Sequence, residues 1–115
     1  MSIIMHLDNK NFNLIKDGKK TIEMRLNDSK RASLEVGDDI TFINRRNDEE
    51  LDVEVINLYR YSNFEELYRH HNKLDLGYNE DDVASPGDMN LYYDTDKINK
   101  YGTVAIEFVI KKEND

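Results

Sequence analysis

The densest group of chemically useful side chains in the sequence lies in the segment KDGKKTIEMR at residues 16–25. Within it, Lys20 and Arg25 can donate hydrogen bonds to phosphate or carbonyl oxygens, and the planar arginine fork suits phosphate well. Glu23 lies between them in the chain and can accept a proton or a hydrogen bond. Lys20 and Glu23 are therefore the candidate catalytic pair, and the whole segment predicts a ligand-binding site.

The same segment predicts how these side chains are positioned. A helix over residues 9–17 would be followed by a strand over residues 21–26, because the apolar residues change from helical spacing to alternation. Alternate residues of a strand share one face at intervals of about 7 Å, so Thr21, Glu23 and Arg25 would lie on the same side. Strand faces rich in charge are usually solvated. An exposed ion pair on the outer face of a barrel is therefore the alternative interpretation.

The remaining periodic segments predict a small mixed barrel of the α+β class. Strands are expected at residues 3–7, 40–44, 51–59 and 103–110, and helices near residues 62–72 and 86–93. The apolar positions of the strand at 51–59 change parity after Val55, which predicts a β-bulge. Ser62 is expected to cap the helix that follows it. A long acidic loop is expected at 75–88 and a frayed tail at 111–115.

Composition limits the class of protein. The chain has 115 residues, of which 38% are hydrophobic and 35% charged, and it contains no cysteine. This length fits one domain over residues 1–115, and the lack of cysteine excludes disulfides and thiolate metal sites. No apolar run approaches the roughly 18 residues that a membrane helix needs, and the N-terminus does not resemble a signal peptide. We therefore expect a cytoplasmic protein without membrane contact, metal or cofactor, and its oligomeric state is left open.

The charge distribution narrows the choice of partner. The formal net charge is −8, but residues 1–46 carry nine basic and seven acidic side chains, whereas residues 47–115 carry seven basic and seventeen acidic ones. Affinity for duplex DNA rests on phosphate neutralisation, so duplex DNA is not an expected partner. The one locally basic stretch runs from Lys10 to Arg31, so a nucleic-acid role has to be local, at a site near Lys16–Arg31. The acidic face over residues 47–115 leaves a protein-interaction module as a further possibility.

Four segments together resemble one known family. The segment IKDGKKTIEMR at residues 15–25 resembles the signature of the ASCH family, a helix ending in Gly-Lys-Lys-Thr and then an Ile-Glu-x-Arg strand. Further segments resemble the family's layout in the same order: VGDDITF at 36–42, YRYSNFEEL at 59–67, and YY at 92–93 followed by KYGTVAI at 100–106. The resemblance spans nearly the whole chain. It implies a small PUA-like β-barrel of about five or six mostly antiparallel strands with two or three short helices.

The resemblance also implies a class of function, namely binding of single-stranded RNA or of a nucleotide-like small molecule. Some members are hydrolases: small bacterial relatives deacylate N4-acetylcytidine, and another type cleaves RNA. Lys20 corresponds to the lysine of the deacylating relatives, but Glu23 stands where they have their catalytic threonine. Asp75 or Glu80 lies in the region of their glutamate.

Besides the protein-interaction module, two functions therefore remain open for this site: ligand binding, and hydrolysis by an amidohydrolase or ribonuclease that uses Lys20 and Glu23. Binding is the preferred one, in a pocket between the first helix, the strand at 21–26 and the second helix, with a tyrosine stacking on the base. The alternative is a hydrolase in which Glu23 activates water and Lys20 stabilises the oxyanion. The residues expected to bind the ligand are Lys19, Thr21, Arg25, Tyr61 and Asp75.

Overall fold

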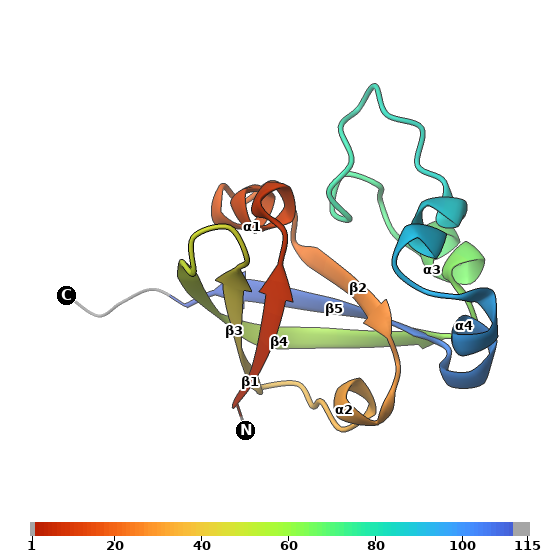
Figure 1. The fold of residues 1–115 in the computed structure, drawn as a ribbon, viewed down its shortest axis with the longest axis horizontal. Helices are drawn as coiled ribbons and strands as arrows, with labels where there is room; N and C mark the ends of the chain where they lie inside the picture. Colours follow the sequence, from red (N-terminus) through yellow and green to blue (C-terminus); the bar gives the residue numbers. More distant parts are fainter. Residues whose placement is uncertain (1, 112–115) are drawn as a thin grey trace.

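A single curled sheet forms the centre of the protein. The computed structural model describes residues 2–111 (Figure 1). Five strands pair in the order β1-β3-β4-β5-β2, with β1 parallel to β3 and every other pair antiparallel. The strands are β1 (Ser2–Leu7), β2 (Ile22–Leu26), β3 (Asp39–Asn44), β4 (Glu50–Tyr61) and β5 (Thr103–Ile110). The sheet curls into a half-barrel, so the expected α+β, barrel-like fold with mostly antiparallel strands is confirmed.

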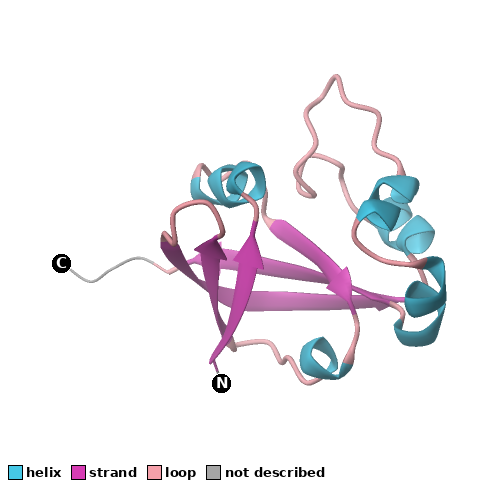
Figure 2. Ribbon diagram, viewed as in Figure 1, coloured by secondary structure: helices cyan, strands magenta, loops and turns pink. Residues whose placement is uncertain are grey.

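Short helices lie around the sheet (Figure 2). They are α1 (Asn9–Lys16), α2 (Ser29–Ala32), α3 (Phe64–His70), the 3-10 helix η1 (Pro86–Leu91) and α4 (Thr95–Tyr101). The two or three helices expected from the sequence were too few, since α2 and α4 were missed. Helix α2 buries no side chain and α4 buries only Ile98, so neither produces an apolar period. Among residues 2–111, no helix has the length and apolar composition needed to span a membrane.

The longest strand carries the expected bulge. The pairing of β4 with β5 shifts register between Val55 and Asn57, where the apolar parity changes in the sequence. A bulge bends a strand and increases its twist. Before the shift, Val53 and Val55 pack in one core cluster, and after it Tyr59 packs against a second. The bulge thus lets one strand serve both halves of the core.

The two core clusters have different partners. The first fills the concave side of the sheet under α1, where the rings of Phe42 and Phe108 meet edge-on at 5.4 Å between centroids. The second lies between β2, α3, η1 and α4, and includes Phe64 and Leu67. The ring of Tyr93 stacks on Phe64 at 6.0 Å. This second cluster supports one wall of the cavity described below.

Some expected boundaries are wrong in detail. Helix α3 is capped by Asn63, whose side chain accepts a hydrogen bond from the Glu66 amide at 2.9 Å, and not by Ser62. Asparagine and serine cap helices about equally well, so the sequence could not decide between these neighbours. The expected long loop is present between α3 and η1. Of the tail expected to fray, residues 112–115 lie outside the described residues, and Lys111 forms an ion pair with Asp39.

Candidate functional site

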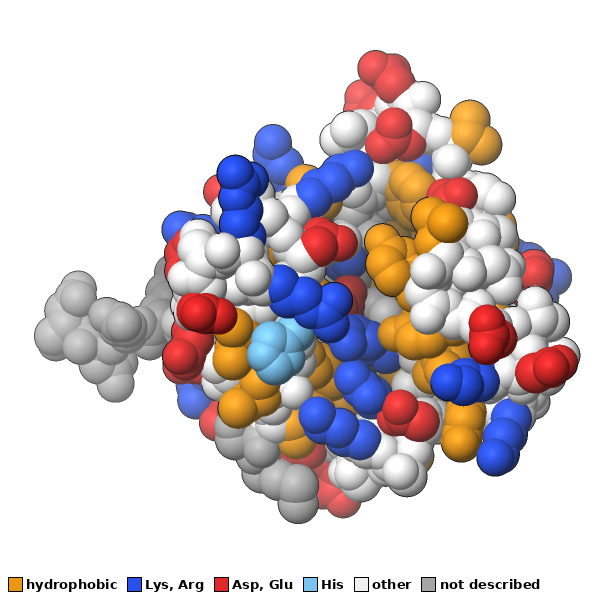
Figure 3. All heavy atoms as spheres, in the orientation of Figure 1, with side chains coloured by type: hydrophobic (Ala, Val, Ile, Leu, Met, Phe, Trp, Pro, Cys, Tyr) orange, Lys and Arg blue, Asp and Glu red, His pale blue; other side chains and the backbone are white. Residues whose placement is uncertain are grey.

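A cavity of about 720 Å³ lies over β2, between α1 and the α3–η1 region (Figure 3). This is where the pocket was expected. The wall on the side of β1 and α1 is mostly polar, with His6, Asp8, Lys10, Asn11 and Arg45 beside the apolar Leu7 and Leu14. The opposite wall is mostly apolar and aromatic, with Tyr68, Leu76, Tyr78, Val83, Met89, Leu91, Tyr92 and Tyr93. Figure 3 shows this contrast as basic side chains on one side of the hollow and hydrophobic ones on the other.

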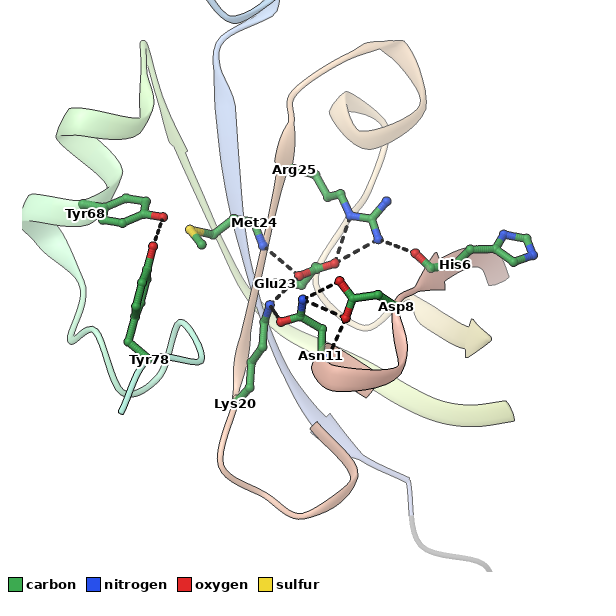
Figure 4. A network of polar contacts seen from close by, with 9 residues as sticks. All are labelled: His6, Asp8, Asn11, Lys20, Glu23, Met24, Arg25, Tyr68 and Tyr78. Atoms are coloured by element: carbon green, nitrogen blue, oxygen red, sulfur yellow. Dashed lines mark hydrogen bonds and ion pairs between the residues drawn. The ribbon is translucent and has the colours of Figure 1, made fainter. Parts of the chain in front are cut away.

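The turn after α1 directs Lys20 into the cavity floor. Gly18 ends the helix with a φ of 78°, and the amides of Lys19 and Lys20 both donate to the Leu14 carbonyl. Positive φ is a conformation that glycine adopts without strain. The Lys20 side chain is only 5% exposed, and its Nζ donates to Asn11 Oδ1 at 2.9 Å (Figure 4). Helix α1 thereby supplies both the turn and the first partner of this lysine.

Glu23 is buried between two cations. Its Oε1 lies 3.0 Å from Lys20 Nζ and accepts from the Met24 amide, while Oε2 accepts from Arg25 Nε at 3.0 Å and lies 2.9 Å from Arg25 Nη2. A carboxylate has about four acceptor positions, so these contacts use all of them. The alternative of an exposed pair is wrong, since Glu23 is only 5% exposed.

The environment of Glu23 fixes its charge. Burial by itself would raise the pKa of this carboxyl, but the charges of Lys20 and Arg25 and their hydrogen bonds outweigh it and lower the pKa to about 2. Glu23 is therefore ionised at neutral pH. A group with so low a pKa is a weak proton acceptor, because an efficient general base has a pKa near the working pH. Its geometry suits positioning of the two cations better than proton transfer.

Arg25 also ties the two edges of the sheet together. Strands β1 and β2 are the unpaired edges, and Arg25 Nη2 donates to the His6 carbonyl on β1 at 2.9 Å (Figure 4). Lys30 Nζ donates to the Ile4 carbonyl of the same strand at 3.2 Å. Side chains thus bridge the gap that backbone pairing leaves open. Within residues 2–111, Arg25 Nη1 makes no hydrogen bond, so it remains able to donate to a ligand.

Similarity to known proteins identifies the family of this chain. Residues 5–112 match the ASCH domain. The chain belongs to the ASCH domain family. Two solved structures are 33% identical: hypothetical protein PH0355 (TM-score 0.81, covering 96% of this chain and 100% of that one) and Protein PF0455 from Pyrococcus furiosus (TM-score 0.69, covering 98% and 100%). An ASCH domain from Lactobacillus crispatus JV V101 shares the fold at 13% identity (TM-score 0.62, covering 95% and 79%). No curated protein matches the chain.

Four of the expected ligand-binding residues of this ASCH domain do not line the cavity. Lys19 is exposed. Thr21 lies before β2 begins, and its amide donates to the Asp75 carbonyl, so Asp75 holds the strand start through its backbone. Tyr61 hydrogen-bonds through its hydroxyl to His71 Nε2 at 2.8 Å, outside the cavity. Lys20, Glu23 and Arg25 are the predicted residues that the fold brings together there.

Several cavity residues were missed by the sequence analysis. Asn11 lies one helical turn after Asp8, the residue that caps α1. This spacing from the cap was the one feature of the sequence that could have placed Asn11 at the start of the helix, near the site. The hydroxyls of Tyr68 and Tyr78 lie 2.8 Å apart, and Tyr78 also donates to Asp88 Oδ2. Burial and these hydrogen bonds raise the pKa of Tyr78. Tyr78 lies within the long loop and Asp88 in η1 just after it, and no local pattern predicts that the two meet at the cavity.

Proposed function

We propose that this ASCH domain binds a nucleotide unit, either as a free nucleotide or within single-stranded RNA. The observation that carries the proposal is a two-sided cavity with cationic donors on its floor, a polar wall and an aromatic wall. Its volume, about 720 Å³, is within the range of small-molecule sites. A nucleotide offers both acceptor oxygens and a flat base, and so complements both walls.

The floor favours ligands that accept hydrogen bonds. Lys20 has three N–H donors and uses two of them on Asn11 and Glu23. Arg25 keeps Nη1 for a ligand, whereas Glu23 has no acceptor position left. We therefore infer that Lys20 and Arg25 meet carbonyl or phosphate oxygens, and that Glu23 holds them in place instead of accepting a hydrogen bond from the base.

The opposite wall offers a surface for the base. Tyr93 is backed by Phe64 in a stacked arrangement with 11° between the rings, which holds it in a fixed orientation. Tyr92, next to it, is 61% exposed. Aromatic side chains bind unpaired bases by stacking, with about 1–3 kcal/mol per base and little sequence preference. Either tyrosine can therefore carry the base while the floor binds its oxygens.

The overall charge favours a small or single-stranded ligand. Five cationic side chains line the cavity although the chain carries a net charge of −8. They are Lys10, Lys20, Arg25, Arg31 and Arg45. A long duplex would have to approach the acidic remainder of the surface, where its phosphates are repelled. Five acidic side chains line the cavity as well, but two of them, Glu23 and Asp28, are already paired with cations of the lining. A single nucleotide entering the cavity can therefore still meet the remaining cationic donors.

Isothermal titration calorimetry tests this function. We expect cytidine monophosphate and a short single-stranded RNA to bind and duplex DNA of the same length not to bind. Lys20→Met removes the buried ammonium and should weaken nucleotide binding by about tenfold or more, the effect of one charged hydrogen bond. Lys19→Met, the matched control, removes the same charge outside the cavity and should change affinity by less than about twofold. Absence of nucleotide binding, or equal losses in the two variants, would contradict the proposal.

Hydrolysis of an acylated cytidine is the second candidate function. The observation in its favour is the buried Lys20, whose remaining donor can stabilise a developing oxyanion. The low pKa of Glu23 weakens its expected role as the base. Incubation with N4-acetylcytidine, read by loss of the acetyl mass, is the test. Turnover that disappears in Lys20→Ala and Glu23→Gln supports the expected mechanism, and turnover that survives in Glu23→Gln removes Glu23 as the base.

A further inference from the structure

Arg31 presents a buried donor without a partner beside the cavity. Its Nη1 forms an ion pair with Asp28 Oδ2 at 3.1 Å, and the residue lines the cavity. Its Nε is buried and has no hydrogen-bond partner among the described residues. No other buried side-chain nitrogen or oxygen within residues 2–111 is left in this way. Buried polar groups in folded proteins almost always have a partner, so this donor is an unsatisfied group on a side chain that lines the cavity.

The position of Arg31 is fixed from both sides. Asp28 caps α2 by accepting from the Arg31 amide at 3.2 Å. Arg60 Nη2 donates to the carbonyls of Arg31, Ala32 and Leu34 at 3.2–3.3 Å, which holds the other end of the helix. A side chain that is already ordered loses little conformational freedom when it binds a ligand. These contacts fix the backbone of Arg31, and the side chain itself is held by the ion pair of its Nη1 with Asp28.

Arg31 belongs to the same end of the cavity as Arg25. Arg25, Arg31 and Tyr93 all line the cavity. One tyrosine face and two guanidinium groups therefore share this end. A base stacked on Tyr93 would bring its own ribose phosphate, or that of its neighbour, within reach of Arg31.

We propose that Arg31 forms a phosphate subsite of the cavity, which makes the protein select nucleotides over nucleosides. The inference rests on the proposed function, since the base and ribose would occupy the rest of the cavity. With Nη1 on Asp28, the Nε and Nη2 donors form a fork that matches two phosphate oxygens. A nucleoside has no group of that charge and shape, so it would leave the buried Nε without an acceptor.

The experiment compares the affinities of cytidine, cytidine 5′-monophosphate and the dinucleotide cytidylyl-cytidine. For the wild-type protein we expect the monophosphate to bind about tenfold or more tightly than cytidine, as one charged bidentate contact implies. Arg31→Gln should abolish that preference and leave cytidine affinity within about twofold. Arg31→Lys, which keeps the charge without the fork, should retain only part of it. If the dinucleotide also binds more tightly than cytidine, the subsite accepts a phosphodiester. If it binds no more tightly than cytidine, the subsite requires a terminal phosphate.

The matched control is Lys30→Gln, which removes one charge from the same helix at a residue that does not line the cavity. It should keep the preference for the monophosphate, and a thermal melt of each variant shows whether it is folded. Equal affinities of the wild type for cytidine and its monophosphate would overturn the subsite, as would an unchanged preference in Arg31→Gln. If neither ligand binds, the proposed function fails, and inorganic phosphate is titrated alone. Binding of inorganic phosphate by the wild type but not by Arg31→Gln then supports the subsite. If the wild type does not bind phosphate either, the subsite is overturned together with the proposed function.

Discussion

At the residue scale, the site depends on one buried carboxylate. Glu23 holds Lys20 and Arg25 at contact distance, and each of the three would be costly to bury without the others. Such a triad is weak support for stability, because desolvation offsets much of the attraction. Its consequence is a rigid arrangement of donors, which is what recognition of a ligand requires.

The first prediction concerns acid. The pKa of Glu23 is lowered from 4.5 to about 2, so the unfolded chain takes up this proton before the folded protein does. Its contribution to stability is therefore complete above about pH 4.5 and is lost as the pH falls through about 2. The shift corresponds to on the order of 3 kcal/mol. Urea unfolding between pH 6 and pH 2 should show a steeper loss of stability for the wild type than for Glu23→Gln. Parallel profiles would contradict this assignment.

The second prediction concerns the fork of Arg25. Arg25→Lys keeps the charge but cannot bind Glu23 and the His6 carbonyl together. The free energy of unfolding should fall by about 1–3 kcal/mol, mainly the cost of leaving part of the buried Glu23 carboxylate without a partner. Arg46→Lys is the control, because Arg46 is exposed and its side chain makes no contact of this kind within the described residues. Urea denaturation measures both, and equal effects would show that the bridge between β1 and β2 contributes nothing.

At the element scale, turns decide where the site residues lie. Gly18 ends α1 just before Lys20, and Gly102 joins α4 to β5, each with positive φ. They differ in their surroundings: a Cβ on Gly18 would meet nothing within 4 Å, whereas one on Gly102 would lie 2.7 Å from the Tyr61 carbonyl oxygen. Replacing each glycine by alanine therefore distinguishes the cost of backbone strain, present at both positions, from the cost of steric overlap, present only at Gly102.

The third prediction uses this pair. Gly18→Ala should lower the free energy of unfolding by about 1–2 kcal/mol, the cost of a left-handed residue with a side chain. Gly102→Ala should cost at least about 1 kcal/mol more, because Tyr61 and the start of β5 must also move. Thermal or urea unfolding of the two variants gives the comparison. Similar losses would mean that the contact between Gly102 and β4 is looser than described.

The elements also show how far the sequence alone can predict this protein. Strand β5 runs from Thr103 to Ile110, as expected, because Val104, Ile106 and Phe108 pack in the first core cluster, while Ala105 on the other face packs in the second. The position of the site was predicted since Lys20, Glu23 and Arg25 lie within six residues of chain. Arg31 ends the basic stretch and Tyr93 is part of the family resemblance, but nothing local places either of them in the cavity. They reach the cavity through packing between distant segments, which a local pattern cannot contain.

At the scale of the whole molecule, the charge is unevenly arranged. The net charge of the chain is −8, whereas the cavity lining is balanced, with five cationic and five acidic side chains. Neutralisation of phosphates is therefore possible at the cavity and unfavourable over most of the remaining surface.

The fourth prediction follows from this arrangement. Because only one or two phosphates are neutralised, the logarithm of nucleotide affinity should fall with the logarithm of salt concentration with a slope of about −1 to −2. Duplex DNA should not compete for the site at any salt concentration used. Titrations at several sodium chloride concentrations give the slope. A slope as steep as that of a protein making six or more phosphate contacts would show that nucleic acid binds across a wider surface.

The central claim, that a nucleotide occupies this cavity, is tested most directly through the methionine methyl groups. Met24 and Met89 line the cavity, whereas Met5 is buried in the first core cluster away from it; Met1 lies outside the described residues. In protein labelled with ¹³C at these methyls, titration with cytidine monophosphate is followed by NMR. We predict saturable shifts of the Met24 and Met89 signals and an unchanged Met5 signal. Saturating nucleotide that leaves Met24 and Met89 unmoved, or that shifts Met5 as strongly, would contradict the claim.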